Sequence, residues 1–152
     1  NYRHMIPQEV LELMPGRVIN LHTSYLPYNR GSSPNFFSFL EDTPKGVTIH
    51  LMSAGLDEGD ILCQRELHFD EEKETFASTY EALLQEIEKL FRENWQQIRE
   101  GSIIPVKQAG PVTYHRMKDL DAIREKVDFD WNMKIGDFKR AYEKAMRKDE
   151  NS

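Results

Sequence analysis

The sequence predicts an α/β protein built around one core of strands and helices. Two runs with strand character, Val18–His22 and Gly46–Met52, are each followed by a polar loop or turn that carries glycine. A long stretch at Thr75–Glu100 has the apolar spacing of a helix. Asn, His and Asp side chains fall at the strand ends and on a turn, which is where α/β proteins place their chemistry. The 152 residues are enough for one domain with a real core.

The first elements are a short helix and a buried strand. Ile6–Met14 is predicted to be helical, because Pro7 suits the first position and the Pro15-Gly16 pair ends the helix. The strand Val18–His22 follows, interrupted by two polar residues. Its apolar positions, which suit burial, are Val18, Ile19 and Leu21.

A loop and a second helix separate the first two strands. Thr23–Pro34 is punctuated by proline and glycine, and Ser33 is a candidate cap for a short helix that begins at Pro34. The buried side of this helix is predicted to be Phe36, Phe37, Phe39 and Leu40. The strand Gly46–Met52 then alternates strictly, so it has two distinct faces. A turn at Gly55–Gly59 and a strand at Asp60–Phe69 follow, and the short link favours antiparallel pairing.

Helices dominate the rest of the chain. The long helix can be capped by Thr75 and ended by Gly101. Its apolar positions are Phe76, Tyr80, Leu83, Ile87, Leu90, Phe91, Trp95 and Ile98. Ile103–Tyr114 reads as a loop or weak strand, and helices are predicted at Lys118–Lys126 and Ile135–Arg147. The last of these has one apolar side, formed by Ile135, Phe138, Ala141, Tyr142 and Ala145. The tail from Arg147 is expected to fray.

Composition excludes several classes of protein. The formal net charge of -6 argues against broad binding of nucleic acid or of an anionic membrane. The single Cys63 excludes an intrachain disulfide framework and favours a reducing, cytoplasmic setting. No signal peptide and no apolar run of membrane-spanning length is present. Because the chain starts at Asn1 without Met, we expect that a front portion is missing.

Three polar residues could act together. Asn20 and His22 are two apart in a strand and therefore share a face, while Asp57 lies on the turn after the next strand. A carboxylate orients a nearby His, and an Asn can donate a hydrogen bond to a developing oxyanion. This set suits acyl transfer to an amine or hydrolysis of an acyl group. The chain has no recognisable Ser or Cys nucleophile motif, so direct transfer is favoured over a covalent enzyme intermediate.

Each of these residues also has an ordinary structural explanation. Asn20 can bond to the backbone of the following loop, His22 can be a satisfied core histidine, and Asp57 can be a simple turn residue. A metal site formed by His22, His50 and Asp57 is a weaker alternative, because the spacing matches no helical zinc motif. Spacing alone does not decide between these readings.

The order of the motifs resembles the catalytic core of the folate-dependent formyltransferases. The segments that carry the likeness lie within Val18–Gln64: Asn-Leu-His, SYLPYNRG, GVTIHLM and GLDEGDILCQ. The resemblance implies an α/β fold with a Rossmann-like formyltransferase core and a mixed sheet, lacking its N-terminal βα elements and followed by C-terminal helices. It implies a catalytic domain over residues 1–115 and a helical extension over residues 116–152.

The resemblance also implies roles for individual residues. Asn20 would stabilise the oxyanion, His22 would assist and transfer a proton, and Asp57 would keep His22 protonated or relay a proton through water. The co-substrate would be 10-formyltetrahydrofolate, with no metal. The residues matched to the folate pocket are His4, Met5, Ile6, His50, Ser53, Ala54, Gly55 and Leu56. The residues matched to the acceptor side are Ser24, Tyr25, Tyr28 and Arg30.

The acceptor implied by the resemblance is a small molecule, with no nucleic acid and no membrane as partner. About fifty residues after the long helix are too few for the β-barrel domain of methionyl-tRNA formyltransferases. The loop at residues 23–39 and the GPVTYHRMKDL stretch look most like enzymes acting on nucleotide-linked amino sugars, and Tyr114, His115 and Arg116 could approach the sugar nucleotide. Glycinamide ribonucleotide formyltransferase, a formyltetrahydrofolate hydrolase and a non-catalytic folate-binding module are the alternatives. A homodimer is a candidate assembly.

Overall fold

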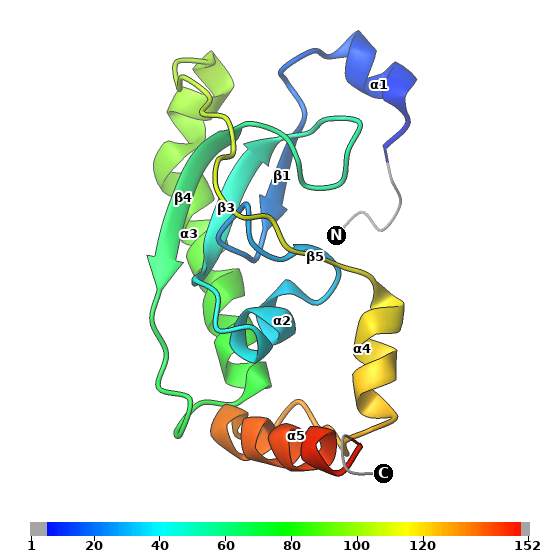
Figure 1. Cartoon of the computed structure of the whole chain (residues 1–152). Helices are drawn as coiled ribbons and strands as arrows, with labels where there is room; N and C mark the ends of the chain where they lie inside the picture. The colour runs from blue at the N-terminus through cyan, green and yellow to red at the C-terminus, as the bar shows by residue number, and fades with distance from the viewer. Residues whose placement is uncertain (1–5, 150–152) are drawn as a thin grey trace.

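The computed structural model describes residues 6–149 and has two layers, a small sheet and the helices around it (Figure 1). The main sheet is antiparallel throughout, and its strands in spatial order are β1 (Ile19–His22), β3 (Lys45–Leu51) and β4 (Ile61–Leu67). A second sheet consists of two short parallel strands, β2 (Arg30–Gly31) and β5 (Tyr114–His115). The α/β class is confirmed, and both strand orientations occur, divided between two sheets.

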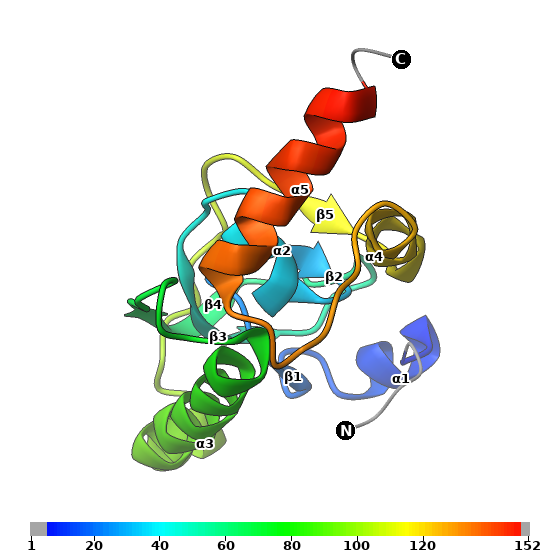
Figure 2. The ribbon, with the colours of Figure 1, turned by 90° about the horizontal axis from the view of Figure 1, so that it is seen from below.

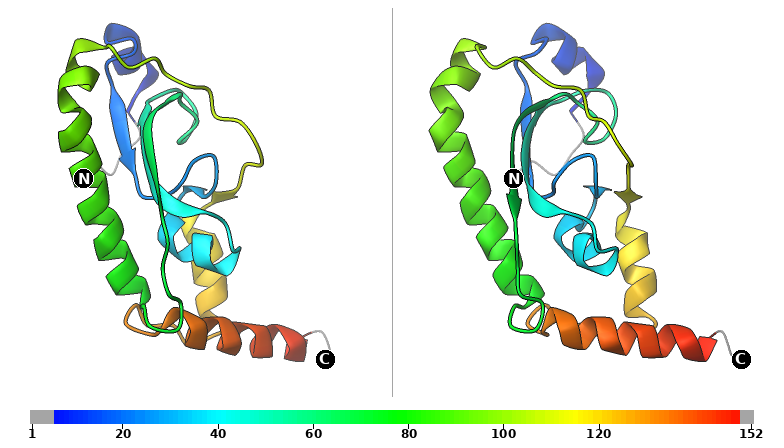
Figure 3. Two further views of the ribbon diagram at one scale, coloured as in Figure 1. Left: turned by 90° about the vertical axis from the view of Figure 1, so that its left-hand side faces the viewer. Right: turned by 60° about the vertical axis from the view of Figure 1, so that its left-hand side comes forward.

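The long helix α3 (Phe76–Glu100) covers one face of the main sheet, and the loops that carry β2 and β5 lie on the other side (Figure 3). The predicted ends of α3 are confirmed. Thr75 is the N-cap, and Gly101 ends the helix in the left-handed conformation with φ 68°. Two of its predicted apolar positions, Tyr80 and Trp95, are 42% and 47% exposed.

The prediction that Leu21 is buried in β1 was wrong. Leu21 is 38% exposed, whereas the neighbouring His22 is 7% exposed. Within the described residues β1 lies at the edge of the sheet, and α3 packs on β3 and β4. Leu21 therefore has little cover, while His22 points into the loop that follows β1.

The short helices agree with the sequence, apart from one cap. The first, α1 (Gln8–Leu13), begins directly after Pro7. The second, α2 (Pro34–Leu40), buries its three phenylalanines as predicted, but Ser33 forms no capping hydrogen bond. Ser33 has a left-handed backbone, φ 53°, whereas a capping residue is normally extended so that its side chain reaches back to the helix.

Two apolar clusters form the core. One lies between the sheet and α3 and contains Val47, Ile49, Leu83, Ile87 and Leu90. The other joins α2 and the start of α3 to the two C-terminal helices, α4 (Met117–Arg124) and α5 (Ile135–Asp149). Seen from below, α5 crosses under α2, and α4 stands beside it (Figure 2). The C-terminal helices thus share a core with the preceding chain. Ala141 is exposed, contrary to prediction, and α5 continues past Arg147.

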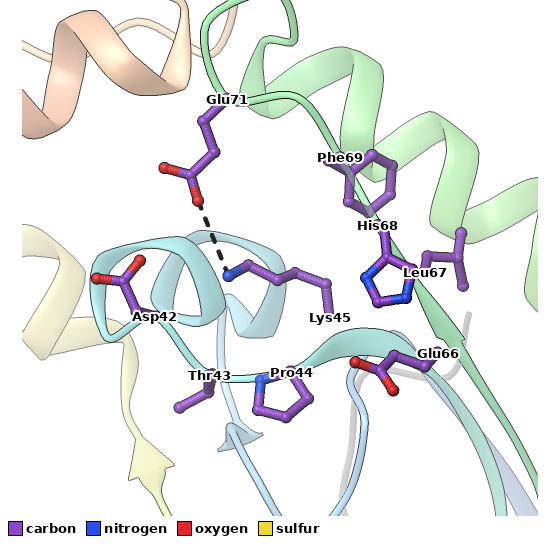
Figure 4. Close-up of a pocket in the computed structure, with 9 residues that line it drawn as sticks. All are labelled: Asp42, Thr43, Pro44, Lys45, Glu66, Leu67, His68, Phe69 and Glu71. Carbon is purple, nitrogen blue, oxygen red and sulfur yellow. Dashed lines mark ion pairs between the residues drawn. The ribbon is translucent and has the colours of Figure 1, made fainter.

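Charged residues also tie α5 to the sheet. Around a polar pocket beside the start of β3, the Glu71 carboxylate lies 3.9 Å from Lys45 Nζ (Figure 4). The same carboxylate lies 3.0 Å from Lys139 Nζ of α5, and Lys139 also pairs with Asp42. Burial lowers the pKa of Lys45. These contacts link α5 to the loop before β3 and to the link between β4 and α3.

Replacement of Thr75 by Ala is expected to destabilise the protein by about 1 kcal/mol. The Thr75 hydroxyl accepts a hydrogen bond from Ser78 N at 3.0 Å, and Ser78 Oγ accepts one from Thr75 N at 3.0 Å. The replacement removes the acceptor of the Ser78 N–H, which would then lack a partner at the helix end. Urea unfolding measures the loss, with the exposed Ser102→Ala as control. Equal stability of Thr75→Ala and the parent chain would contradict the capping role.

Candidate active site

The structure brings Asn20, His22 and Asp57 together at one side of the sheet. In the antiparallel pairing of β1 with β3, Asn20 lies opposite His50, so their side chains share a face. Asp57 sits on the turn between β3 and β4 with a left-handed backbone, φ 53°, and is 8% exposed. Residues 37 positions apart in the chain are thereby placed in direct contact.

The Asp57 carboxylate is held through both oxygens. Asn20 Nδ2 donates to Oδ1 at 3.0 Å, and the main-chain N–H of Gly31 donates to Oδ2 at 2.9 Å. A side chain at Gly31 would strike the carbonyl of His115, 2.3 Å from the place of a Cβ, so glycine is required there. Burial alone would raise the pKa of Asp57, but the neighbouring His50, His22 and the Gly31 N–H together lower it to about 2. The carboxylate is therefore ionised at neutral pH.

His50 belongs to the same cluster. Its Nδ1 lies 2.8 Å from the carbonyl of Leu51, which requires a proton on Nδ1. His50 Nε2 lies 3.3 Å from Asn20 Nδ2 and 3.5 Å from Asp57 Oδ1. Asn20 Nδ2 donates to the Asp57 carboxylate, which orients the amide with its NH2 group toward both side chains. His50, 2% exposed, thus lies at the inner end of the site.

His22 is held in one tautomer. Its Nε2 lies 3.1 Å from the carbonyl of Asn29 and donates to it, which leaves Nδ1 directed at Asp57 Oδ2, 3.7 Å away. Burial lowers the pKa of His22 more than the Asp57 charge raises it. The ring is therefore neutral at pH 7, and both His22 Nδ1 and Asp57 Oδ2 are acceptors that face each other.

Sequence reasoning missed Asn29, although it positions His22. Asn29 is completely buried, and its backbone is left-handed with φ 55°. Its side chain donates to Glu41 at 3.3 Å and accepts from Thr43 at 2.7 Å, so the carbonyl that binds His22 is fixed. The available signal was an Asn in a loop that also holds Pro and Gly, since Asn tolerates this backbone region better than most residues.

The residues matched to the acceptor side differ in exposure. Ser24 is buried and its hydroxyl donates to the carbonyl of Tyr28 at 2.8 Å, so Ser24 holds the loop. Tyr25 and Tyr28 are half-buried. The Arg30 guanidinium is bound by Gln108, which sequence reasoning also missed.

The residues matched to the folate pocket are mostly on the turn. Ser53, Ala54 and Leu56 are exposed and Gly55 is half-buried, beside the buried Asp57. Ile6 is half-buried at the approach to α1. His4 and Met5 lie outside the described residues. In β5, His115 stacks on Phe37 at a ring distance of 3.6 Å, whereas Tyr114 is exposed.

A metal site is not formed by these side chains. Between residues 6 and 149, no group of three or more His, Cys, Asp or Glu side chains is arranged to hold a metal ion. The alternative built on His22, His50 and Asp57 is therefore not supported by the geometry. In the same part of the chain, no helix combines the length and the apolar character needed to cross a membrane.

The His22 ring is expected to titrate below its usual value of about 6.5. Because the unfolded chain binds a proton at higher pH than the folded chain, the stability contributed by neutral His22 is complete above about pH 6.5 and is lost as pH falls through the folded pKa. Proton NMR of the histidine ring, assigned with His22→Asn, measures the midpoint. A midpoint above 6.5 would contradict the dominance of burial.

Comparison with known protein families, sequences and structures finds formyltransferases in each case. The family model described as formyl transferase matches residues 1–94. The chain is similar to the crystal structure of the formyltransferase PseJ from Anoxybacillus kamchatkensis in complex with UDP-4,6-dideoxy-4-formamido-L-AltNAc and tetrahydrofolate. The identity is 45% and the TM-score 0.83, over 89% of this chain and 71% of that one.

Two curated relatives extend the comparison. A dTDP-4-amino-4,6-dideoxyglucose formyltransferase of Mycobacterium tuberculosis is 34% identical over 71% of this chain and 46% of its own length. A methionyl-tRNA formyltransferase of Thermodesulfovibrio yellowstonii is 35% identical over 74% of this chain and 37% of its own length. The chain thus spans less than half the length of these relatives.

Proposed function

The chain belongs to the formyl transferase family, and we propose that it serves the transfer of a formyl group from 10-formyltetrahydrofolate to the amino group of a nucleotide-linked amino sugar. The observation that carries the proposal is the convergence of Asn20 and His22 on the ionised Asp57. The choice of acceptor is supported by PseJ, whose complex holds a UDP-linked formamido sugar and tetrahydrofolate.

The amine would bind between two acceptors. His22 Nδ1 and Asp57 Oδ2 are 3.7 Å apart, beyond a direct hydrogen bond. A nitrogen that lies about 2.9 Å from each atom completes a triangle and donates one N–H to each. The acceptor amine would thus enter in neutral form, with its lone pair directed at the formyl carbon. This geometry favours the role of Asp57 as a proton relay over a role in keeping His22 protonated.

Transfer would then proceed by direct attack. A bond forms between the amine nitrogen and the formyl carbon, and the carbonyl oxygen takes up negative charge. Collapse of this tetrahedral intermediate breaks the bond from the formyl carbon to N10 of the folate. The amine proton passes to His22 or Asp57, and N10 receives a proton. The Asn20 amide is directed at Asp57 and His50, so stabilising the oxyanion would require it to exchange one of these hydrogen bonds.

The exposed side of the turn is the proposed folate contact. Ser53, Ala54 and Leu56 are accessible, and main-chain groups there and at Ile6 would read the pterin ring. Tyr25, Tyr28 and Arg30 are proposed to face the acceptor. Ser24 would act on that side by holding the loop.

An acceptor panel tests the function. The chain is incubated with 10-formyltetrahydrofolate and, in separate reactions, with UDP- and dTDP-linked amino sugars, glycinamide ribonucleotide, methionyl-tRNA or buffer alone. Formation of tetrahydrofolate and of the formamido product is measured together. We expect turnover that depends on an amino sugar nucleotide. Equal release of formate in buffer would indicate hydrolysis, and no acceptor-dependent turnover in any reaction would contradict the proposal.

A further inference from the structure

The segment between α3 and β5 touches the site through two half-buried polar side chains, Thr113, which accepts a hydrogen bond from Asn29 N, and Gln108. Residues 104–110 have no regular secondary structure, and Gln108 is the half-buried residue among exposed neighbours. Two hydrogen bonds between the main chains of Val106 and Ile61, at 2.8 and 2.9 Å, attach this segment to the start of β4. Gln108 is thereby brought to the turn that carries Asp57.

Gln108 uses both ends of its amide. Nε2 donates to the main-chain carbonyl of Asp57 at 2.7 Å and to that of Gly59 at 2.8 Å. Oε1 accepts from Arg30 Nε at 3.1 Å and from Arg30 Nη2 at 2.8 Å. The two donor hydrogens and both acceptor positions of the side chain are therefore occupied.

These bonds join the two elements that meet at the Asp57 carboxylate. The turn provides the carboxylate, and β2 provides the Gly31 N–H that binds Oδ2 at 2.9 Å. Gln108 holds the turn through its main chain and holds β2 through Arg30, the neighbour of Gly31. Asp57 has a left-handed backbone, which aspartate adopts more readily than most residues but less readily than glycine, and the Gln108 bonds to the carbonyls of Asp57 and Gly59 support this conformation.

We propose that Gln108 is a positioning residue, which sets the distance between the Asp57 carboxylate and His22 by clamping the Asp57 turn to β2. The inference rests on the proposed function for its kinetic consequences. Its structural consequence, the placement of Asp57 beside His22, can be measured without turnover. On the same turn, the exposed carboxylate of Glu58 lies 3.5 Å from Arg30 Nη1, so this ion pair also joins the turn to β2, beside the hydrogen bonds of Gln108.

Replacement of Gln108 by Met keeps the length of the side chain and removes all four hydrogen bonds. We expect kcat to fall roughly tenfold to hundredfold, since small displacements of catalytic groups have effects of this size. KM should change less, because Gln108 itself does not touch the acceptor in the proposed geometry and Arg30 keeps its ion pair with Glu58. The exposed Gln85→Met on α3 is the matched control and should leave kcat unchanged.

Two further measurements separate positioning from general destabilisation. The charged and titratable groups facing His22 are Asp57 and His50, and Asp57 raises the pKa of His22. In an NMR titration, the pH midpoint of the His22 ring should therefore be lower in Gln108→Met than in the parent chain. The same shift is expected of Asp57→Asn. In the Asp57→Asn background, Gln108→Met should cost less than about threefold in kcat, because the group it positions is already lost.

The outcomes are distinct for the two proposals. An unchanged His22 midpoint, or the same loss of kcat in both backgrounds, would overturn the positioning role of Gln108. A parent chain that shows no formyl transfer would contradict the proposed function alone, because the NMR comparison still reports on the clamp. A lower midpoint in Gln108→Met with unchanged urea unfolding supports the clamp independently of activity.

Discussion

Replacement of Asp57 by Asn is expected to lower kcat roughly a hundredfold or more, the usual cost of losing a positioned acid–base group. Both oxygens of Asp57 accept hydrogen bonds, from Asn20 Nδ2 and from Gly31 N. An Asn amide at this place must direct its NH2 group at one of these donors. The charge that faces His22 is also lost, so the acceptor amine has no carboxylate to bind.

The matched control is Asp60→Asn, which removes a carboxylate from the same link between β3 and β4. This change should leave kcat within about twofold, because Asp60 is not among the groups around His22. Steady-state rates with the best acceptor of the panel measure both variants. A loss of less than about threefold in Asp57→Asn would count against its role in proton transfer. The His22 midpoint should fall in the same variant.

Replacement of Phe36 by Ala is expected to destabilise the protein by about 3–5 kcal/mol. Phe36 is completely buried, and its ring lies 5.1–5.3 Å from four other aromatic rings. These rings belong to Phe37 of α2, Phe76 of α3, Phe129 of the link before α5 and Phe138 of α5. Truncation opens a cavity where the C-terminal helices meet the rest of the chain.

Urea unfolding measures this loss, and Phe36→Leu should cost less because it leaves a smaller cavity. Phe91→Ala, at a half-buried position of α3, is the control and should also cost less. The parent chain should unfold in one transition, since residues on both sides of the proposed boundary at 115 and 116 share one core cluster. A loss below about 1 kcal/mol in Phe36→Ala would contradict the central place of this ring.

The parts of the site that sequence could predict are those fixed by local spacing. Alternation placed Asn20 and His22 on one face of a strand, and glycines marked the turn that carries Asp57. The helix α3 could also be predicted from the sequence, because its apolar period, its Thr75 cap and its terminal Gly101 are all local features. The order of these motifs indicated a formyltransferase core, and the family match confirms that assignment.

Other features depend on contacts that no local pattern contains. Gln108 reaches Arg30 across 78 residues. The Asn29 carbonyl accepts a hydrogen bond from His22, and the side chain of Asn29 is held by Glu41 and Thr43. The burial of Leu21 was mispredicted because alternation identifies a face of a strand but not what covers it.

The sequence by itself determined the α/β class, the long helix and the strand face and turn that carry Asn20, His22 and Asp57, because each follows from the periodicity and order of neighbouring residues. Only the tertiary structure decided which atoms of these residues face each other. Burial and long-range hydrogen bonds set the tautomer of His22, the ionisation of Asp57 and the gap of 3.7 Å between them. Those properties arise from groups far apart in the chain, and the folded backbone alone brings such groups together.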